Sequence, residues 1–191
     1  MSHVTLRDTI SASWGIFFVV WLLAAVFTKR TVYHESAARR LRYIIPILLG
    51  CYLVFRGYRL RPPFNTYLIP QTDAILVAAA ILCLCGLGFC LWARAVLGRN
   101  WSGTVTLKED HELIVRGPYR LVRHPIYTGL LAMLMATWME QAHIAGMLGL
   151  IFVFVSFWIK LNYEEDVMRN QFPKQYADYQ ERVKRIIPFV L

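Results

Sequence analysis

Charged residues are absent from two long stretches of this sequence. Asp8 and Lys29 enclose twenty uncharged residues, and Asp73 and Arg94 enclose another twenty. Each stretch is long enough to cross the ~30 Å hydrocarbon core of a bilayer as a helix. Because 57% of the chain is hydrophobic and its mean hydropathy is +0.43, these absences exclude an ordinary soluble domain and predict an integral membrane protein.

Charges are also missing from the interior of the predicted spans, and cysteine is scarce. A transporter or channel is expected to carry charged groups inside its spans, so that class is disfavoured. The cysteines lie inside predicted spans without a histidine or acid beside them, which favours packing over a disulfide or a metal site. They are Cys51, Cys83, Cys85 and Cys90. No repeat, low-complexity tract or long linker divides the chain, so one domain over 1–191 is predicted, with three spans in 1–93 and the remainder in 94–191.

Five membrane-spanning helices are predicted from the apolar runs. The run at 43–55 is short for a span, but Arg42 and Arg56 can reach the two interfaces. Residues 125–159 hold one charge, Glu140, and at ~1.5 Å per residue they would make ~50 Å of helix, enough for two crossings joined at a hairpin. The predicted spans are 10–28, 43–56, 74–94, 126–139 and 142–160.

Lysine and arginine gather in three segments. Residues 29–42 carry five, 94–124 carry six and the tail from residue 160 carries six more, whereas 56–73 carry three and the N-terminus carries one. Since basic segments favour the cytoplasm, the predicted topology places the N-terminus outside and these three segments inside. No cleavable signal sequence is evident, so the first span is expected to be retained. The formal charge of +9 fits this topology and anionic lipid headgroups, and no nucleic-acid partner is expected.

The densest combination of unusual residues runs from Gly117 to Gly129. It reads G-P-Y, then R-H-P, then Y-x-G, at the start of an apolar segment. Singly, each residue has an ordinary explanation, such as proline at a first helical position or tyrosine at a membrane interface. The combination within thirteen residues favours a binding site on the 94–124 loop, which is expected to be compact and partly extended.

Acids follow the fifth apolar run closely, at Glu164, Glu165 and Asp166. Carboxylates so near a membrane need water or a partner, so they are expected to form a solvated turn or to meet the cationic 116–124 cluster or a ligand. Lys160 lies four residues before Glu164, on the same helical face. Residues at near-helical spacing then predict an amphipathic helix along the cytoplasmic surface. They are Val167, Met168, Phe172, Tyr176, Tyr179 and Val183.

Two stretches of this sequence resemble the isoprenylcysteine carboxyl methyltransferase family of membrane-bound enzymes. They are "HELIVRGPYRLVRHPIYTG" and "YEEDVMRNQFPKQYADYQERVKRIIP". The hallmark of that family is G-x-Y followed by R-H-P-x-Y-x-G and, after a hairpin, by paired glutamates. The resemblance covers about half the chain, residues 95–191, and the N-terminal half shares only its apolar spans.

The resemblance implies an all-α membrane fold that transfers a methyl group from S-adenosyl-L-methionine to a lipophilic acceptor entering from the bilayer. The cofactor is expected in a cytoplasm-facing pocket closed by the loop and the tail. The positions that match the family for cofactor binding are Thr106, His111, Glu112, Leu113, Ile114, Gly117, Tyr119, His124, Pro125, Ile126, Tyr127 and Glu164. Gly117 and Gly129 are expected to let the backbone approach the cofactor.

The methyl acceptor stays open among a carboxylate, an amine and a thiol. Where the family has a substrate-binding arginine, this chain has Lys160, which keeps the charge but not the bidentate fork. A carboxylate needs no general base, and Lys160 or Arg123 would position it. An amine, as in a phospholipid, or a small thiol would need a base, for which Glu165 and His124 are candidates. A sterol-reductase-like enzyme with a nicotinamide cofactor and a non-enzymatic membrane protein are the remaining alternatives.

Overall fold

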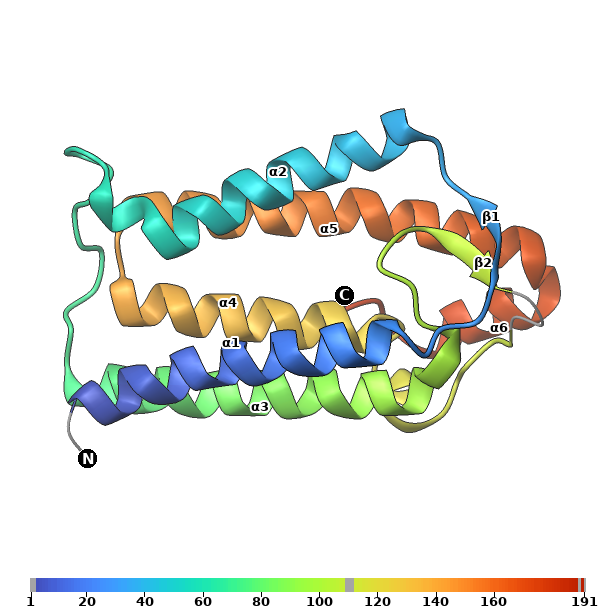
Figure 1. Cartoon of the computed structure of the whole chain (residues 1–191), viewed down its shortest axis with the longest axis horizontal. Coiled ribbons are helices and arrows are strands. Elements are labelled where there is room, and N and C mark those ends of the chain that lie inside the picture. Colours follow the sequence, from blue (N-terminus) through green and yellow to red (C-terminus); the bar gives the residue numbers. More distant parts are fainter. Residues whose placement is uncertain (1–2, 109–111, 189, 191) are drawn as a thin grey trace.

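Long helices, lying side by side, make up most of the chain (Figure 1). The computed structural model describes residues 3–108, 112–188 and 190. The helices are α1 His3–Ala25, α2 Ala37–Arg56, α3 Asp73–Leu97, α4 Pro125–Gln141, α5 Ile144–Gln171 and α6 Pro173–Arg182. The short elements in the described residues are the 3-10 helices η1 Gly57–Arg59, η2 Gly98–Asn100 and η3 Gly117–Arg120, and the strands β1 Thr31–His34 and β2 Thr106–Lys108.

Four helical segments are long and apolar enough, by length and composition, to cross a membrane. Within the described residues they are Val4–Ala25, Ala37–Arg59, Asp73–Asn100 and Ile144–Gln171. They overlap four of the five predicted spans, with bounds that differ by up to eleven residues, and confirm the helical architecture of an integral membrane protein. The remaining predicted span, 126–139, forms α4, which has only 17 residues, so a fifth crossing is not confirmed.

The helix that contains the fifth predicted span does not end at Lys160. α5 continues without a break to Gln171, and the acids at 164 and 165 are paired there with Tyr127 of α4 and with Arg123 of the preceding loop. The helix ends where Pro173, which has no N–H to donate, starts α6. The predicted amphipathic helix over residues 167–183 is therefore wrong as a single element, and it is divided between the end of α5 and α6.

The fold is not purely helical, because β1 pairs antiparallel with β2. This two-stranded sheet joins the segment between α1 and α2 to the loop after α3, with residue 34 opposite Thr106. Of the loop predicted to be partly extended, Thr106–Lys108 forms a strand, while residues 112–115 form no regular element. The sheet ties the N-terminal half of the chain to the loop that carries the predicted site.

Glycine pairs hold the long helices close together. Gly86 of α3 faces Gly129 of α4, where a Cβ on Gly129 would lie 2.6 Å from the Gly86 carbonyl oxygen. Gly50 of α2 faces Gly149 of α5, where a Cβ on Gly149 would lie 2.5 Å from the Gly50 oxygen. Small residues allow such close backbone approach between membrane helices. Helix packing thus explains the glycine at position 129, and the expected approach of its backbone to a cofactor stays a prediction.

The predicted hairpin tip between the last two apolar runs is confirmed. α4 ends at Gln141, Ala142 adopts a left-handed conformation with φ 54°, and α5 begins at Ile144. His143 caps α5, since its Nδ1 accepts a hydrogen bond of 2.8 Å from the Gly146 amide. Burial lowers the pKa of His143, which favours the neutral ring that this cap requires. The tip lies at the end of the bundle opposite β1 and β2 (Figure 1).

Substitution of Gly86 by alanine is expected to destabilise the protein. The added Cβ would lie 2.7 Å from the Gly129 carbonyl oxygen, so α3 and α4 must separate, and overpacking of this kind costs about 1–3 kcal/mol. Gly88→Ala on the same helix is the matched control, because a Cβ there meets nothing within 4 Å. Thermal unfolding in detergent measures the difference. Equal melting temperatures for the two variants would contradict the proposed packing role of Gly86.

Candidate functional site

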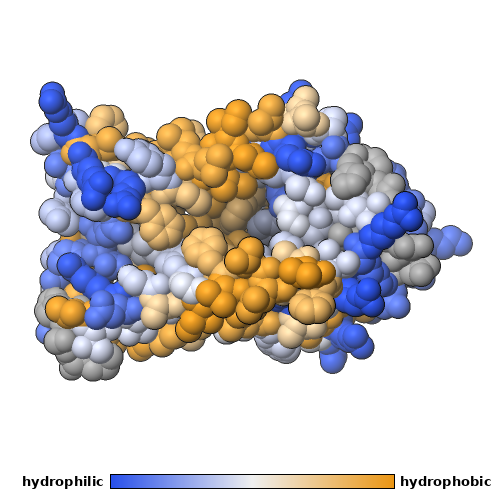
Figure 2. Space-filling view, in the orientation of Figure 1, coloured by the Kyte–Doolittle hydropathy of each residue, from blue (hydrophilic) through white to orange (hydrophobic). Residues whose placement is uncertain are grey.

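A cavity of about 650 Å³ lies at the end of the bundle that carries β1 and β2. One wall is apolar and comes from α1, α2, α4 and α5. It includes Phe18, Trp21, Ile47, Leu130 and Phe157. The opposite wall comes from the 100–106 and 112–127 segments and from the polar face of α5. In Figure 2 the molecule is hollowed in this region, between hydrophobic residues on one side and more hydrophilic residues on the other.

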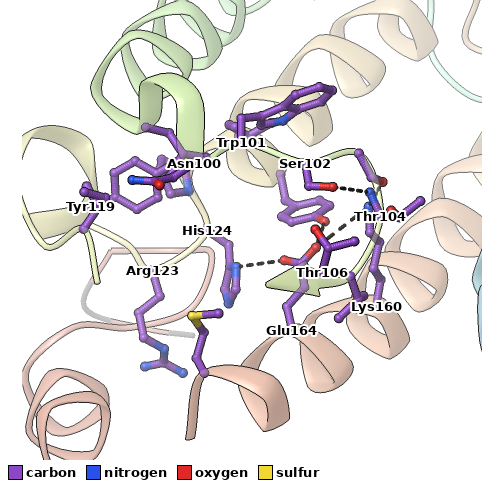
Figure 3. A pocket seen from close by; sticks show the side chains of 18 of the residues that line it. Asn100, Trp101, Ser102, Thr104, Thr106, Tyr119, Arg123, His124, Lys160 and Glu164 are labelled. Carbon is purple, nitrogen blue, oxygen red and sulfur yellow. Dashed lines mark hydrogen bonds and ion pairs between the residues drawn. The ribbon is translucent and has the colours of Figure 1, made fainter. Parts of the chain in front are cut away.

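A polar cluster centred on Glu164 stands in the cavity wall (Figure 3). The Tyr127 hydroxyl donates a hydrogen bond of 2.6 Å to Glu164 Oε1. His124 Nδ1 lies 3.7 Å from Glu164 Oε2, and Lys160 Nζ lies 3.8 Å from Glu164 Oε1. The first turn of α4 and one face of α5 therefore bring together the residues that the two halves of the motif supply.

Lys160 is buried, and its ammonium is surrounded by electron-rich groups. Its Nζ donates a hydrogen bond of 2.7 Å to the Gly103 carbonyl. It also lies 5.3 Å from the centre of the Tyr43 ring and 5.5 Å from that of the Tyr127 ring, within the range of cation–π attraction. These contacts, together with Glu164, compensate the loss of hydration around the ammonium. Through its hydrogen bond to Gly103, Lys160 thus holds the 100–106 segment against the cavity.

Glu165, next along α5, is fully buried and binds the loop and the tail. Its Oε1 accepts hydrogen bonds from Arg123 Nε and Nη2, at 3.0 and 2.9 Å, and lies 3.1 Å from His124 Nε2. Its Oε2 accepts from Gln180 Nε2 at 2.8 Å and from Arg185 Nε and Nη2, at 3.2 and 2.8 Å. Of the alternatives expected for the three acids, contact with the cationic 116–124 cluster is confirmed for Glu165, whereas Asp166 is exposed and pairs with Arg169.

The C-terminal segment lies directly against the start of α4. The amides of Arg123 and His124 donate to the carbonyls of Lys184 and Arg185, at 2.8 and 2.9 Å. The Thr128 hydroxyl donates to the Ile186 carbonyl at 2.7 Å. This strand-like contact fixes the backbone on both sides of the His124 ring, so the position of His124 depends on the tail.

Tyr119 is positioned by α6 and by the turn that precedes it. The Tyr179 hydroxyl donates a hydrogen bond of 2.5 Å to the Tyr119 carbonyl. Burial raises the pKa of both phenols above their usual range, so they remain protonated donors. Gly117 begins η3 with φ +61°, and a Cβ there would lie 2.9 Å from Val96 Cγ2. The positive φ of this turn and the close packing on α3 both explain why position 117 is a glycine.

Most of the predicted site residues are brought together around the cavity. The residues that line it are Thr106, Glu112, Leu113, Ile114, Tyr119, Arg123, His124, Pro125, Ile126, Tyr127, Lys160 and Glu164. Gly117 and Glu165 are not among the residues that line it, and His111 lies outside the described residues. Arg123 borders the cavity, but its guanidinium is bound to Glu165 and to the carbonyls of Gln180 and Val183.

Glu35 and Tyr43 contribute to the site although no motif or spacing in the sequence indicates them. Glu35 is buried, and its Oε1 accepts hydrogen bonds from the Tyr43 hydroxyl and, at 3.2 Å, from the Val105 amide. They support the 100–106 segment from the side of α2. Two polar atoms of residues that line the cavity, Asn100 Oδ1 and Thr106 Oγ1, are buried without a hydrogen-bond partner among the described residues.

The fold and the cavity define a class: a helical membrane protein with a polar ligand site at one end of an apolar bundle. Within that class, a family-wide sequence model of the phospholipid methyltransferases matches residues 74–175, more than half of the chain. The chain therefore belongs to the phospholipid methyltransferase family. The resemblance to isoprenylcysteine carboxyl methyltransferases is also confirmed by individual relatives and by a solved structure.

The chain is similar to protein-S-isoprenylcysteine O-methyltransferase B of Arabidopsis thaliana, with 30% identity over 96 residues, 49% of each chain. It is also similar to protein-S-isoprenylcysteine O-methyltransferase of Tribolium castaneum, with 31% identity over 135 residues, 66% of this chain and 47% of the relative. The chain thus spans about half the length of these relatives. A solved eukaryotic intramembrane Ras methyltransferase, an isoprenylcysteine carboxyl methyltransferase, shares the fold with a TM-score of 0.65 and 20% identity, over 98% of this chain and 68% of that one.

Substitution of Glu165 by glutamine is expected to destabilise the attachment of the loop and the tail. It removes the counter-charge of Arg123 and Arg185, and breaking a buried ion pair costs about 3–5 kcal/mol. Asp166→Asn is the matched control, because its exposed carboxylate pairs with Arg169 at the surface, which is worth about 0–1 kcal/mol. Denaturant unfolding in detergent measures both. A Glu165→Gln variant as stable as Asp166→Asn would contradict the role assigned to Glu165.

Proposed function

We propose that this chain transfers the methyl group of S-adenosyl-L-methionine to a lipophilic acceptor that reaches the cavity from the membrane. The observation that supports this most directly is the cluster of Tyr127, His124, Lys160 and Glu164 at one end of a cavity whose other wall is apolar. A polar cofactor and a hydrocarbon tail require these two environments side by side. Membership of a methyltransferase family supports the reaction type.

The residues around the cavity fit the cofactor. The cofactor carries an ammonium group, for which the Glu164 carboxylate is a charge-assisted acceptor. It also carries hydroxyl and amine groups, which match the unpartnered Asn100 Oδ1 and Thr106 Oγ1. The volume of about 650 Å³ lies within the usual range for small-molecule sites. When bound, the cofactor supplies an electrophilic methyl group on a sulfonium.

A carboxylate on a hydrophobic molecule is the leading acceptor. It is already a nucleophile, so the protein has only to position it and to exclude water. Lys160 is the cation that faces the cavity for this task, whereas the guanidinium of Arg123 is occupied by Glu165. We therefore assign Lys160 to the acceptor and Arg123 and Glu165 to positioning. An isoprenylcysteine-like acid, as in the names of the relatives, matches this acceptor chemistry.

A phospholipid amine is the second candidate acceptor, favoured by the description of the matching family and by the surroundings of His124. When His124 Nε2 donates to Glu165, Nδ1 carries the lone pair and faces the cavity beside Glu164. A neutral imidazole in this tautomer can take a proton from an ammonium or a thiol before methyl transfer. This role requires the same Glu165 network that fixes the ring.

We also propose that residues 1–191 form one domain with five crossings, the N-terminus outside and the cavity on the cytoplasmic side. The cavity wall takes residues from α1 and α2 as well as from the C-terminal half, which supports a single domain. α4 lies along α3 (Figure 1), which supports a fifth, short crossing. The distribution of lysine and arginine supports the orientation.

The decisive experiment is a search for the methylated product. Purified protein is incubated with methyl-labelled S-adenosyl-L-methionine and a native lipid extract, and labelled material is identified by mass spectrometry. A labelled ester identifies a carboxylate acceptor, and a labelled amine identifies a phospholipid acceptor. If no label is transferred by a protein that binds the cofactor, the proposed reaction is wrong.

Loss of the Glu164 carboxylate is expected to weaken cofactor binding. A charge-assisted hydrogen bond contributes about 1.5–3 kcal/mol, so Glu164→Gln should bind S-adenosyl-L-methionine roughly ten to a hundred times more weakly. Tyr127→Phe keeps Glu164 but removes the hydroxyl that donates a hydrogen bond of 2.6 Å to it. This variant should bind S-adenosyl-L-methionine several-fold more weakly than the wild type. Calorimetric titration in detergent measures these affinities, with the exposed Asp178→Asn as control. Unchanged affinity in both site variants would remove the basis for this assignment.

Lys160 provides a separate test of the acceptor. Lys160→Met keeps most of the apolar stem but holds no anion, so on a carboxylate acceptor it should raise KM or lower kcat. Lys160→Arg keeps the charge and should retain activity on the acid. Steady-state kinetics on the identified acceptor, with the cofactor saturating, separates this effect from loss of cofactor. Full activity of Lys160→Met on an acid would show that Lys160 does not hold the acceptor.

A further inference from the structure

A second, smaller cavity lies outside the candidate site, between α1 and α3. It has a volume of about 300 Å³ and is at the end of the bundle where both helices finish. Most of its wall is apolar, and two arginines stand at one end. The arginines are Arg94 and Arg99, and the apolar wall includes Val20, Ala24, Leu91 and Ala95. Both helices are candidate membrane spans. The cavity therefore combines an apolar wall, suited to an acyl chain, with a cationic end formed by the two arginines.

Arg94 is 6% exposed and lacks an anionic partner among the residues that the structure describes. Its Nη2 donates to the Ala24 carbonyl at 2.7 Å and its Nη1 to the Gly98 carbonyl at 2.5 Å. It also stacks on Trp101, 4.8 Å from the ring centre. These groups are neutral, and Arg94 Nε has no hydrogen-bond partner in the described part of the chain. Burying a guanidinium without a counter-charge is unfavourable.

Arg99 adds an exposed cation at the rim of the same cavity. Its backbone is fixed, because its carbonyl accepts a hydrogen bond of 2.9 Å from the Lys29 amide after α1. The two arginines therefore lie where an apolar groove meets the end of two spans. Guanidinium groups bind phosphate oxygens in a bidentate manner, and basic pockets between membrane helices near a membrane surface bind anionic lipid headgroups.

We propose that this cavity binds an anionic phospholipid. Its headgroup phosphate pairs with Arg94 and Arg99, and one acyl chain lies along Val20, Ala24 and Leu91. The lipid supplies the negative charge that Arg94 lacks within the described chain. This site does not depend on the proposed methyl transfer, since neither arginine lines the larger cavity.

The test is thermal unfolding of the full chain in detergent with added lipid. Phosphatidylglycerol in roughly tenfold excess over its Kd should raise the melting temperature by about 3–5 °C. Phosphatidylcholine, which has a phosphate but no net charge, and soluble glycerol phosphate, which has no acyl chain, should each give less than half of that shift. Equal shifts with phosphatidylglycerol and phosphatidylcholine would overturn the charge requirement, and a full shift with glycerol phosphate would overturn the requirement for a lipid.

Two variants then locate the site without removing the hydrogen bonds from Arg94 to the Ala24 and Gly98 carbonyls. Arg99→Ala removes the exposed cation and should weaken phosphatidylglycerol binding about tenfold. Ala95→Phe places a ring in the groove from an exposed position and should abolish the shift. Arg116→Ala removes an exposed cation that lines neither cavity and should respond like wild type. The proposal is wrong if Arg99→Ala and Ala95→Phe, folded by size-exclusion chromatography, both keep the wild-type shift.

Discussion

The buried carboxylate of Glu165 is the interaction on which the arrangement of the site depends. It holds Arg123 and His124 from the loop and Gln180 and Arg185 from the tail. In a buried setting such charge-assisted hydrogen bonds are strong, and leaving any of the charges unpaired is costly. The loop and the tail are therefore bound to α5 in one arrangement. The geometry around the cavity follows from that arrangement.

Adjacent glutamates on α5 serve opposite purposes because successive helical residues point about 100° apart. Glu165 turns toward the loop and the tail and is completely buried. Glu164 turns toward the cavity, where Tyr127, His124 and Lys160 surround it only in part. The first turn of α4 also contributes its partial positive charge at this point. The Glu164 carboxylate is therefore only partly enclosed and lies in the cavity wall, as a binding group for a cation requires.

The sequence was informative where the physical requirement is local. Long uncharged runs predict membrane helices, and the R-H-P motif and the paired glutamates predict the cluster around Glu164. A charged residue such as Lys160 does not predict where α5 ends, because its charge is compensated by Gly103 and Glu164 inside the protein and the helix continues past it. Glu35 and Tyr43 were missed because their role depends on contact with Val105, seventy residues beyond Glu35. No local pattern reports such a contact.

Where the family resemblance implies an arginine, this chain has Lys160, and an ammonium would hold an acceptor differently from a guanidinium. An ammonium has three donors, and here one is bound to the Gly103 carbonyl and another faces Glu164. One N–H donor of Lys160 remains for the carboxylate acceptor proposed above. The acid would then accept a single hydrogen bond instead of the two parallel hydrogen bonds that an arginine offers. A single contact constrains the direction of the carboxylate less than two parallel hydrogen bonds do. The apolar wall must then supply more of the alignment, and the shape of the hydrocarbon tail becomes the main determinant of which acid is methylated.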